Sequence, residues 1–283
     1  MSGTAVSAAP PRGRTRVSPG HAVKDTAVIM RRNLRRVVRM PQLLLFATVQ
    51  PVMFLVLFNY VFGGAVGRSI PAAAGGDYLN WLLPGVLLQM AVFGSTQTAM
   101  GLIEDLNKGV IDRFRSLPMA RSAVLAGRTV ADLVRNVFVL ALVLGLGYAL
   151  GFRAQTSVVP VAGGLLVAMI FGFALSWVMA CIGLAVKNAE AAQPAAMIPI
   201  FPMVFASSVF VPTGTLPDWL RVFADHQPVT RTANAVRGLI LGEGALAPTQ
   251  TVAGEVTAAL IWALAIVAAA APLAVRLYRR AVS

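Results

Sequence analysis

Long apolar stretches alternate with short polar segments along most of the chain, and this pattern predicts a helical membrane protein. Hydrocarbon about 30 Å thick needs roughly 20 apolar residues per helix, and several stretches run that long without a charge. Short segments of alternating polarity, which are typical of a transmembrane β-barrel, do not occur in the sequence. The expected fold is therefore all-α with six transmembrane helices, over residues 42–63, 81–103, 130–151, 158–186, 194–211 and 256–275.

The residues before the first span form two different patterns. Residues 1–20 are rich in Ala, Ser, Pro and Arg without an apolar run followed by a cleavage site, which predicts a disordered cytoplasmic tail and no signal peptide. Residues 21–40 place apolar side chains at helical spacing between basic ones, which predicts an amphipathic helix at the membrane interface. Its arginines are Arg31, Arg32, Arg35, Arg36 and Arg39. The alternative is a solvated basic helix that only enforces orientation.

The segment between the fifth and sixth spans, residues 212–255, is not uniformly polar. Apolar residues recur at helical spacing around Trp219 and again around Val236, in two runs that are too short to cross a bilayer. Two short amphipathic helices that return into the outer leaflet are predicted, with a plain surface loop as the alternative. Residues 41–283 are thus expected to form one transmembrane domain.

The composition supports a membrane protein, and the distribution of charge predicts on which side of the membrane its ends lie. The chain has 283 residues, of which 57% are hydrophobic and 12% charged, and a mean hydropathy of +0.74, which is too apolar for an ordinary soluble domain. The net charge of +13 comes from Lys and Arg that flank the spans, which indicates topology and lipid contact instead of nucleic-acid binding. Most of them precede the first span or follow the second and the sixth. Both termini are therefore expected in the cytoplasm, and the protein in the cytoplasmic (inner) membrane.

Few side chains that could catalyse a reaction or couple an ion gradient occur in the chain. No G-x-x-x-x-G-K-[ST] loop is present to cradle nucleotide phosphates, and the two histidines, His21 and His226, lack the spacing of a metal site. Cys181 is the single cysteine, so no disulfide forms within one chain. Within the predicted spans only Asp132 and Arg135 are charged. The sequence therefore indicates no enzyme, no metal site and no ion-coupled carrier, and uphill transport would need energy from another protein.

The cytoplasmic loop after the second span, residues 104–128, carries a distinctive short pattern. Apolar residues from Leu106 to Leu117 fit one face of a helix, charged residues fill its other faces, and Pro118 ends it. Such a helix can insert its apolar side chains into a groove of a partner while its charges fix the register. An interfacial helix that rests on lipid explains the same periodicity.

Two parts of the sequence resemble a known family. The run GVIDRFRSLPM from Gly109 to Met119, with Gly127 to Asp132 after it, is similar to the central signature of ABC-2-type permeases, particularly the daunorubicin-resistance branch. The outer segment from Pro212 to Gly238 is similar to the pattern of the same branch, although Gln227 stands where Asn is expected. The resemblance covers nearly the whole chain except the N-terminal tail.

The resemblance implies a division of labour between this chain and separate partners. The chain would be the permease subunit of an ATP-driven exporter, with no cofactor of its own, while ATP and Mg²⁺ would bind to two copies of a cytoplasmic ABC ATPase. A second permease chain, expected to be identical, would complete the transporter. Residues 21–40 resemble the connecting helix of the family, and the loop after the second span resembles the coupling helix that docks on the ATPase. The coupling residues would be Glu104, Asp105, Gly109, Asp112, Arg113, Phe114, Leu117 and Pro118.

The substrate cavity of this family lies between the two permeases, bordered by spans two and five. In this chain the candidate lining residues are aromatic, Met and isolated polar side chains, which suit an amphiphilic or aromatic ligand. They are Gln89, Phe93, Gln97, Met100, Met197, Phe201, Phe205 and Ser208. Ordinary helix packing explains the same residues.

The expected function is export of a hydrophobic or amphiphilic drug or antibiotic. Export of a lipid, or of a lipid-linked glycan of the cell envelope, is the alternative within the same superfamily. A membrane sensor or immunity protein that binds a drug without moving it is the alternative from another class. ATP-dependent transport separates the first two functions from the third.

Overall fold

The computed structural model describes residues 41–66, 70, 77–107, 136–186 and 189–282, and every regular element within these ranges is helical. The all-α fold class is confirmed for this part of the chain. The helices are α2 (Pro41–Val66), α3 (Tyr78–Gly94), α4 (Thr96–Asn107), an unlabelled helix (Asn136–Ala149), α7 (Val158–Val186), α8 (Ala189–Phe205), α9 (Asp218–His226), α10 (Pro228–Leu241) and α11 (Val252–Val282). Two short 3₁₀ helices lie in the connections: η3 (Thr213–Thr215) between α8 and α9, and η4 (Glu243–Ala245) between α10 and α11. The predicted tail 1–20 and the predicted amphipathic helix 21–40 lie outside the described residues.

Three helices in the described part are long and apolar enough to cross a membrane: Tyr78–Gly101, Val158–Val186 and Val252–Leu277. The fourth predicted span coincides with α7, the second falls within α3 and α4, and the sixth falls within α11. Two shorter apolar helices, Val49–Gly64 and Asn136–Ala149, occupy the places of the first and third predicted spans. These lengths and compositions agree with a membrane protein, and the number of six spans stays a prediction.

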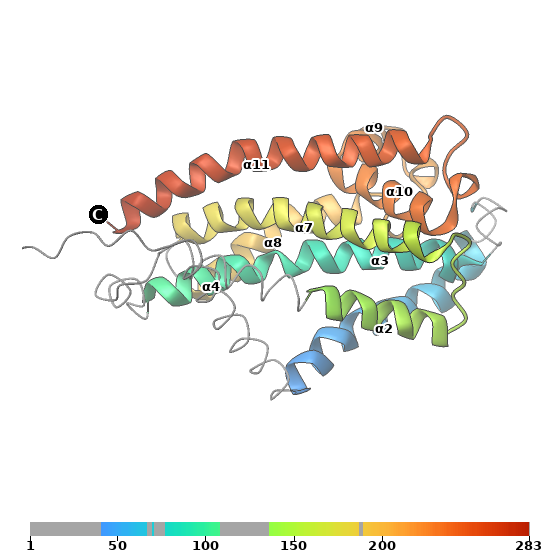
Figure 1. Ribbon diagram of the computed structural model, residues 1–283, viewed down its shortest axis with the longest axis horizontal. Coiled ribbons are helices and arrows are strands. Elements are labelled where there is room, and N and C mark those ends of the chain that lie inside the picture. Colours follow the sequence, from blue (N-terminus) through green and yellow to red (C-terminus); the bar gives the residue numbers. More distant parts are fainter. Residues whose placement is uncertain (1–40, 67–69, 71–76, 108–135, 187–188, 283) are drawn as a thin grey trace, which may run out of the picture.

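The long helices lie along the longest axis of the molecule (Figure 1). α7 packs against both α3 and α11, and α2 packs against α3. α10 contacts α3, α7 and α11 at the end of the bundle where α11 begins, while the C-terminus lies at the opposite end. α3 is thereby enclosed, and nearly all of its side chains from Tyr78 to Val92 are buried.

Small residues allow α7 to lie close to α3 and α4. A methyl group added at Gly172 of α7 would lie 2.8 Å from the carbonyl oxygen of Ala91, and one at Gly183 would lie 3.1 Å from that of Ala99. Both contacts are to backbone atoms, which cannot move aside as a flexible side chain can. Close backbone approach at small residues is the usual way in which helices pack in a bilayer, because lipid provides little hydrophobic drive for helix association.

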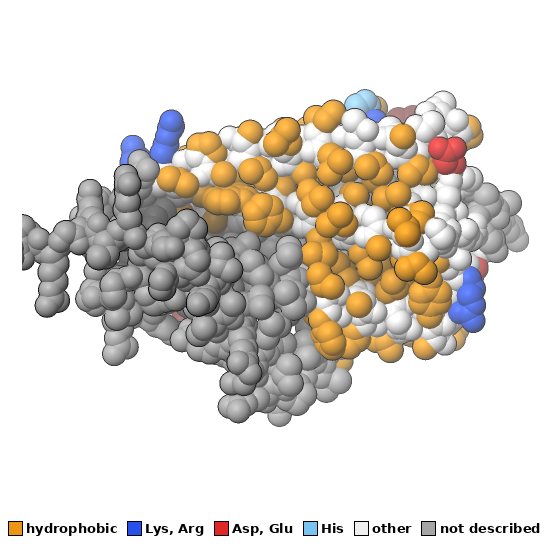
Figure 2. Space-filling view, viewed as in Figure 1, with side chains coloured by type: hydrophobic (Ala, Val, Ile, Leu, Met, Phe, Trp, Pro, Cys, Tyr) orange, Lys and Arg blue, Asp and Glu red, His pale blue; other side chains and the backbone are white. Residues whose placement is uncertain are grey.

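The surface of the bundle is apolar between its ends. On the face shown in Figure 2, hydrophobic side chains cover the middle of the described part, and most charged side chains in view lie toward the two ends. An apolar belt bounded by charge is the arrangement expected of a protein whose middle lies in hydrocarbon.

The two short helices predicted between the last two spans correspond to α9 and α10, but their surroundings differ. On α9 the apolar Trp219 and Val222 are 76% and 65% exposed. On α10 nearly every residue from Pro228 to Leu241 is buried, because α3, α7 and α11 surround it. α10 is therefore part of the core, and its polar side chains need partners inside the protein.

Candidate functional site

Half of the fourteen phenylalanines of the chain form one continuous row, which we call the phenylalanine row. Its rings come from α2, α3, α8 and the segment that follows α8. On α2 they recur every four residues, so they lie on one face of the helix. The members are Phe54, Phe58, Phe62, Phe93, Phe201, Phe205 and Phe210.

Neighbouring rings of the row are close, and most are nearly parallel. The ring centroids of Phe201 and Phe205 are 5.2 Å apart, with an angle of 12° between the ring planes. Phe210 lies 5.1 Å from Phe205 and 4.6 Å from Phe58, at angles of 29° and 21°. Phe93 meets Phe201 edge-on at 6.0 Å. These distances and orientations are those in which aromatic pairs attract each other.

Rings on both sides of the centre of the row are exposed, and Phe210, at the centre, is buried. Phe201 and Phe205 on α8 are 49% and 39% exposed and Phe62 on α2 is 36% exposed, whereas Phe210 is 3% exposed. α2 packs mainly against α3, and α8 mainly against α4 and α7, so the rings connect two helices that rest on different neighbours. The row therefore presents apolar ring faces at the surface and is fixed at its centre.

Three of the eight side chains predicted at the substrate cavity belong to the row: Phe93, Phe201 and Phe205. Gln89 and Ser208 are each 3% exposed and lie inside the protein. Ser208 belongs to a polar network with Asn234 of α10 and not to the row. The remaining predicted side chains are partly or fully exposed, and they are Gln97, Met100 and Met197.

The predicted coupling and connecting residues lie almost entirely outside the described part of the chain. Only Glu104 and Asp105 fall on a described backbone, that of α4, which ends at Asn107. The others are Gly109, Asp112, Arg113, Phe114, Leu117 and Pro118 of the loop, and Arg31, Arg32, Arg35, Arg36 and Arg39 of the N-terminal segment. Their assignment stays a prediction.

α8 ends at Phe205, although the fifth span was predicted to continue to residue 211. The reason is a side chain from the junction of α9 and α10. The buried amide of Gln227 donates hydrogen bonds to the carbonyl oxygens of Met203 at 2.8 Å and of Ala206 at 2.6 Å. Because these bonds satisfy two carbonyl oxygens at the helix end, they favour the end of the helix at this point.

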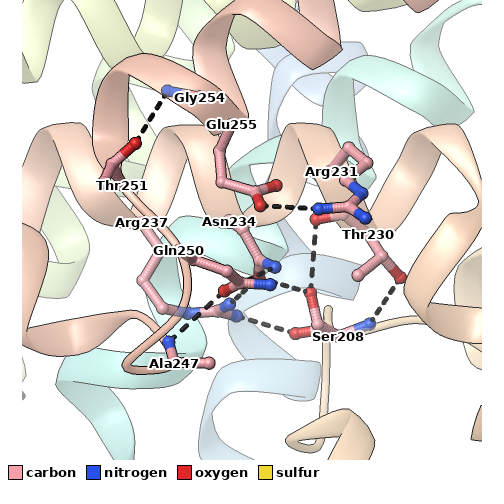
Figure 3. A network of polar contacts seen from close by, with 10 residues as sticks. All are labelled: Ser208, Thr230, Arg231, Asn234, Arg237, Ala247, Gln250, Thr251, Gly254 and Glu255. Atoms are coloured by element: carbon pink, nitrogen blue, oxygen red, sulfur yellow. Dashed lines mark hydrogen bonds and ion pairs between the residues drawn. The ribbon is translucent and has the colours of Figure 1, made fainter.

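Arg237 of α10 is 1% exposed and lies at the centre of a polar network (Figure 3). Nη2 donates to the carbonyl oxygen of Ser208 at 2.7 Å, and Nε donates to that of Trp81 at 3.2 Å. Nη1 donates to Oδ1 of Asn234 at 2.9 Å. Within the part of the chain that the structure describes, no carboxylate pairs with this guanidinium. Carbonyl oxygens, an amide oxygen and the ring of Trp81, 3.7 Å from Cζ, hold the buried cation instead.

Residues 206–211 form an irregular segment whose backbone is bound by side chains of other elements. Oγ1 of Thr230 accepts a hydrogen bond from the backbone N–H of Ser208 at 3.2 Å. The hydroxyl of Tyr78, on α3, donates to the carbonyl oxygen of Phe210 at 2.6 Å. Non-helical backbone at membrane depth is tolerated only where the protein supplies such partners. The segment that carries the central ring of the row is therefore fixed from two sides.

A second arginine connects α10 with α11. Nη1 of Arg231 lies 2.8 Å from Oε1 of Glu255, near the start of α11 (Figure 3). The side chain of Glu255 is 4% exposed and that of Arg231 is 29% exposed. α10 is thus tied through Arg237 to α3 and through Arg231 to α11.

Sequence reasoning assigned no structural role to three side chains that hold this region together, namely Tyr78, Gln227 and Arg237. In the sequence, Arg237 is placed only within the outer segment from Pro212 to Gly238, as part of the family pattern. One signal was available, because Arg237 stands between Val236 and the apolar end of α10, where a charge needs partners inside the protein. The sequence contains no comparable signal for Tyr78, since its acceptor on Phe210 lies 132 positions away.

This region consists of exposed aromatic rings in front of a buried polar network. The exposed part of the row consists of ring faces and edges, to which an apolar or aromatic molecule can bind. The polar atoms of the network around Arg237 are hydrogen-bonded to one another. The network therefore holds in place the backbone segment that carries Phe210. Among the described residues, no group of three or more His, Cys, Asp or Glu side chains is placed to hold a metal ion.

Comparison with known proteins gives one family match and several relatives. A family model described as ABC-2 type transporter matches residues 24–241, which include every member of the phenylalanine row. The daunorubicin resistance ABC transporter permease protein DrrB1 of Streptomyces coeruleorubidus is 35% identical over 285 residues, which cover 98% of this chain and 96% of that protein. The probable doxorubicin resistance ABC transporter permease protein DrrC of Mycobacterium tuberculosis is 29% identical over 236 residues, with coverage of 83% and 81%.

Proposed function

Because this chain belongs to the ABC-2 type transporter family, we propose that it is the permease of an exporter that moves amphiphilic drug or antibiotic molecules out of the cell. A separate subunit binds ATP with Mg²⁺ and hydrolyses it. The observation that carries the proposal is the phenylalanine row, which presents exposed rings on α8 and α2. The printed names of the relatives, which refer to resistance to daunorubicin and doxorubicin, support a drug as the substrate.

Force is transmitted through the cytoplasmic loop 104–128, whose first residues are the last residues of α4. The coupling residues from Glu104 to Pro118 dock on the ATPase. α4 ends at Asn107, within this loop, and packs against both α7 and α8. A displacement of the loop therefore reaches α8, which carries Phe201 and Phe205. The displacement does work only if ATP binds one state of the ATPase more tightly than the other.

The assembly consists of two permease chains and two ATPase chains in the cytoplasmic membrane, with both termini of each permease in the cytoplasm. The described C-terminal end of α11 supports this orientation, because Arg276 and Arg280 lie there, at the end of the bundle opposite to α10 (Figure 1). Basic residues favour the cytoplasmic side of a membrane. Residues 21–40 serve as the connecting helix between the ATPase and the first span.

ATP-driven uptake of a dye tests the proposal. Inverted membrane vesicles that contain the permease and its ATPase are expected to accumulate ethidium when ATP is added. Asp112→Ala, in the coupling loop, is expected to abolish this uptake. Asp218→Ala, at the exposed start of α9, is the matched control and is expected to leave uptake unchanged.

The outcomes separate the candidate functions. Uptake that survives Asp112→Ala would contradict the assignment of the coupling loop. Saturable binding of the dye without ATP-dependent uptake in the unmodified protein would indicate a sensor or an immunity protein. ATP-dependent movement of a fluorescent lipid, without movement of the dye, would indicate an exporter of envelope lipids.

A further inference from the structure

The central ring of the phenylalanine row belongs to Phe210, whose backbone carbonyl accepts a hydrogen bond from the hydroxyl of Tyr78. No sequence-based prediction gives Tyr78 a role. Phe210 is the one ring, among those described, that contacts rings of both α2 and the α8 end: Phe54 at 5.9 Å, Phe58 at 4.6 Å and Phe205 at 5.1 Å. Its position therefore decides whether the two branches of the row form one surface.

Helical hydrogen bonding does not fix the backbone of Phe210, because α8 has already ended at Phe205. The hydroxyl of Tyr78 donates to its carbonyl oxygen instead, at 2.6 Å. Tyr78 is itself held firmly, since it is 2% exposed and its ring stacks on Trp81 with centroids 6.3 Å apart. Trp81 in turn lies under the guanidinium of Arg237. The hydroxyl is thus a fixed donor at the start of α3.

We propose that Tyr78 is a positioning residue for substrate recognition, because its hydroxyl places the ring of Phe210 and so joins the α2 and α8 branches of the row. This inference rests on the proposed function, since it treats the row as the surface that binds an aromatic part of the substrate. Without the hydroxyl, the carbonyl of Phe210 is buried without a donor, and the irregular segment turns to find another one. Ring stacking depends on distance and angle, so a shift of Phe210 divides the row into two parts.

The substitution Tyr78→Phe tests the proposal with the loss of a single atom. It keeps the ring that stacks on Trp81 and removes only the donor to Phe210. Tyr60→Phe is the matched control, because Tyr60 lies on α2 and is 82% exposed. The full-length permease is purified in nanodiscs of phosphatidylcholine, and its affinity for ethidium, a planar aromatic dye, is measured by fluorescence anisotropy. Tyr78→Phe is expected to weaken binding about two- to tenfold, the range that one aromatic pair contributes, and Tyr60→Phe is expected to have no effect.

A double-mutant cycle distinguishes positioning of Phe210 from a general loss of structure. Phe210→Leu removes the ring itself and is expected to weaken ethidium binding at least as much as Tyr78→Phe. When both changes are combined, the affinity is expected to equal that of Phe210→Leu alone, because the hydroxyl then has no ring to place. A structural defect would instead lower the affinity further in the double variant. Thermal unfolding of each variant confirms that the protein remains folded.

Three results would overturn the proposal: equal affinity in Tyr78→Phe and the unmodified protein, a further loss in the double variant, or no saturable ethidium binding by the unmodified protein. None of them depends on the ATPase, since binding is measured on the permease alone. Failure of the proposed function is recognised separately, by the absence of ATP-driven uptake in vesicles. An exporter whose uptake is normal while Tyr78→Phe binds normally would retain its function and refute only the role of Tyr78.

Discussion

Arg237 of α10 lies over the indole ring of Trp81 of α3, with its Cζ atom 3.7 Å from the ring centroid. Nε of the same guanidinium donates to the backbone carbonyl of Trp81, so one arginine binds both the ring and the main chain of one residue. A third contact, to the carbonyl of Ser208, attaches the segment after α8. One buried cation therefore joins α10, α3 and the segment after α8. The same segment carries Phe210, so this junction helps to position the phenylalanine row.

Replacement of Arg237 by Met should destabilise the protein strongly. The change keeps an apolar side chain of similar length, but it leaves the carbonyl oxygen of Ser208 without its donor and removes both the hydrogen bond and the ring contact to Trp81. Each buried acceptor without a partner costs about 1–3 kcal/mol, so the apparent melting temperature in detergent should fall by many degrees. Arg221→Met is the control, since Arg221 is half-exposed and pairs with Asp225 at the surface of α9. A similar melting temperature in both variants would show that the junction contributes nothing to stability.

A methyl group at Gly85 should displace the segment that follows α8. In the structure, a methyl group at this position of α3 would overlap the carbonyl oxygen of Val209, and this contact to backbone cannot be relieved by a rotamer change. Gly85→Ala is therefore expected to lower both the melting temperature and the affinity for ethidium, because Phe210 is adjacent to Val209. At Gly145, beyond the backbone of its own helix, no atom of the described residues lies within 4 Å of the same methyl group. Gly145→Ala should be neutral or stabilising, since Ala is favoured over Gly in helices by about 1 kcal/mol.

Much of the fold follows from the sequence because the thickness of the bilayer constrains helix length. The predicted span 158–186 agrees with α7 at both ends, since this stretch is continuously apolar and polar residues bound it. The end of α8 could not be predicted in the same way. Residues 206–211 are apolar enough to continue a span, and the helix stops where Gln227, distant in sequence, binds the last carbonyl oxygens.

The candidate site could be predicted only in part, for a similar reason. Phe93, Phe201 and Phe205 are predicted from the sequence, because they are aromatic residues on spans two and five. The regular spacing of Phe54, Phe58 and Phe62 is visible in the sequence, and it shows that they share a helix face but not what that face contacts. Only the three-dimensional structure shows that Phe210 connects them with α8. Contacts between distant parts of the chain produce the row, and local periodicity carries no information about them.

Loss of the Gln227 side chain should loosen the end of α8. Gln227→Ala removes the donor to Met203 and Ala206, so the last turn of the helix is expected to open more often. Hydrogen exchange measured by mass spectrometry should therefore be faster in peptides that cover residues 202–207, where the backbone N–H of Ala206 bonds to Pro202. Gln193→Ala, at an exposed position of the same helix, is the control and should leave exchange in these peptides unchanged. Unchanged exchange in Gln227→Ala would show that the helix end is stable without this amide.

The ion pair between Arg231 and Glu255 should respond unequally to the loss of either partner. Arg231→Met leaves the carboxylate of Glu255 buried and unpaired at 4% exposure, and a buried charge without its partner costs about 3–5 kcal/mol. Glu255→Gln keeps an acceptor for Arg231, and the arginine is 29% exposed and can reach water, so the expected cost is about 1 kcal/mol. The double variant should be more stable than Arg231→Met alone, because it buries no unpaired charge. Melting temperatures of the three variants in one detergent measure the order. Equal losses in the two single variants would mean that Glu255 reaches solvent or another cation when Arg231 is absent, and that the pair does not clamp α10 to α11.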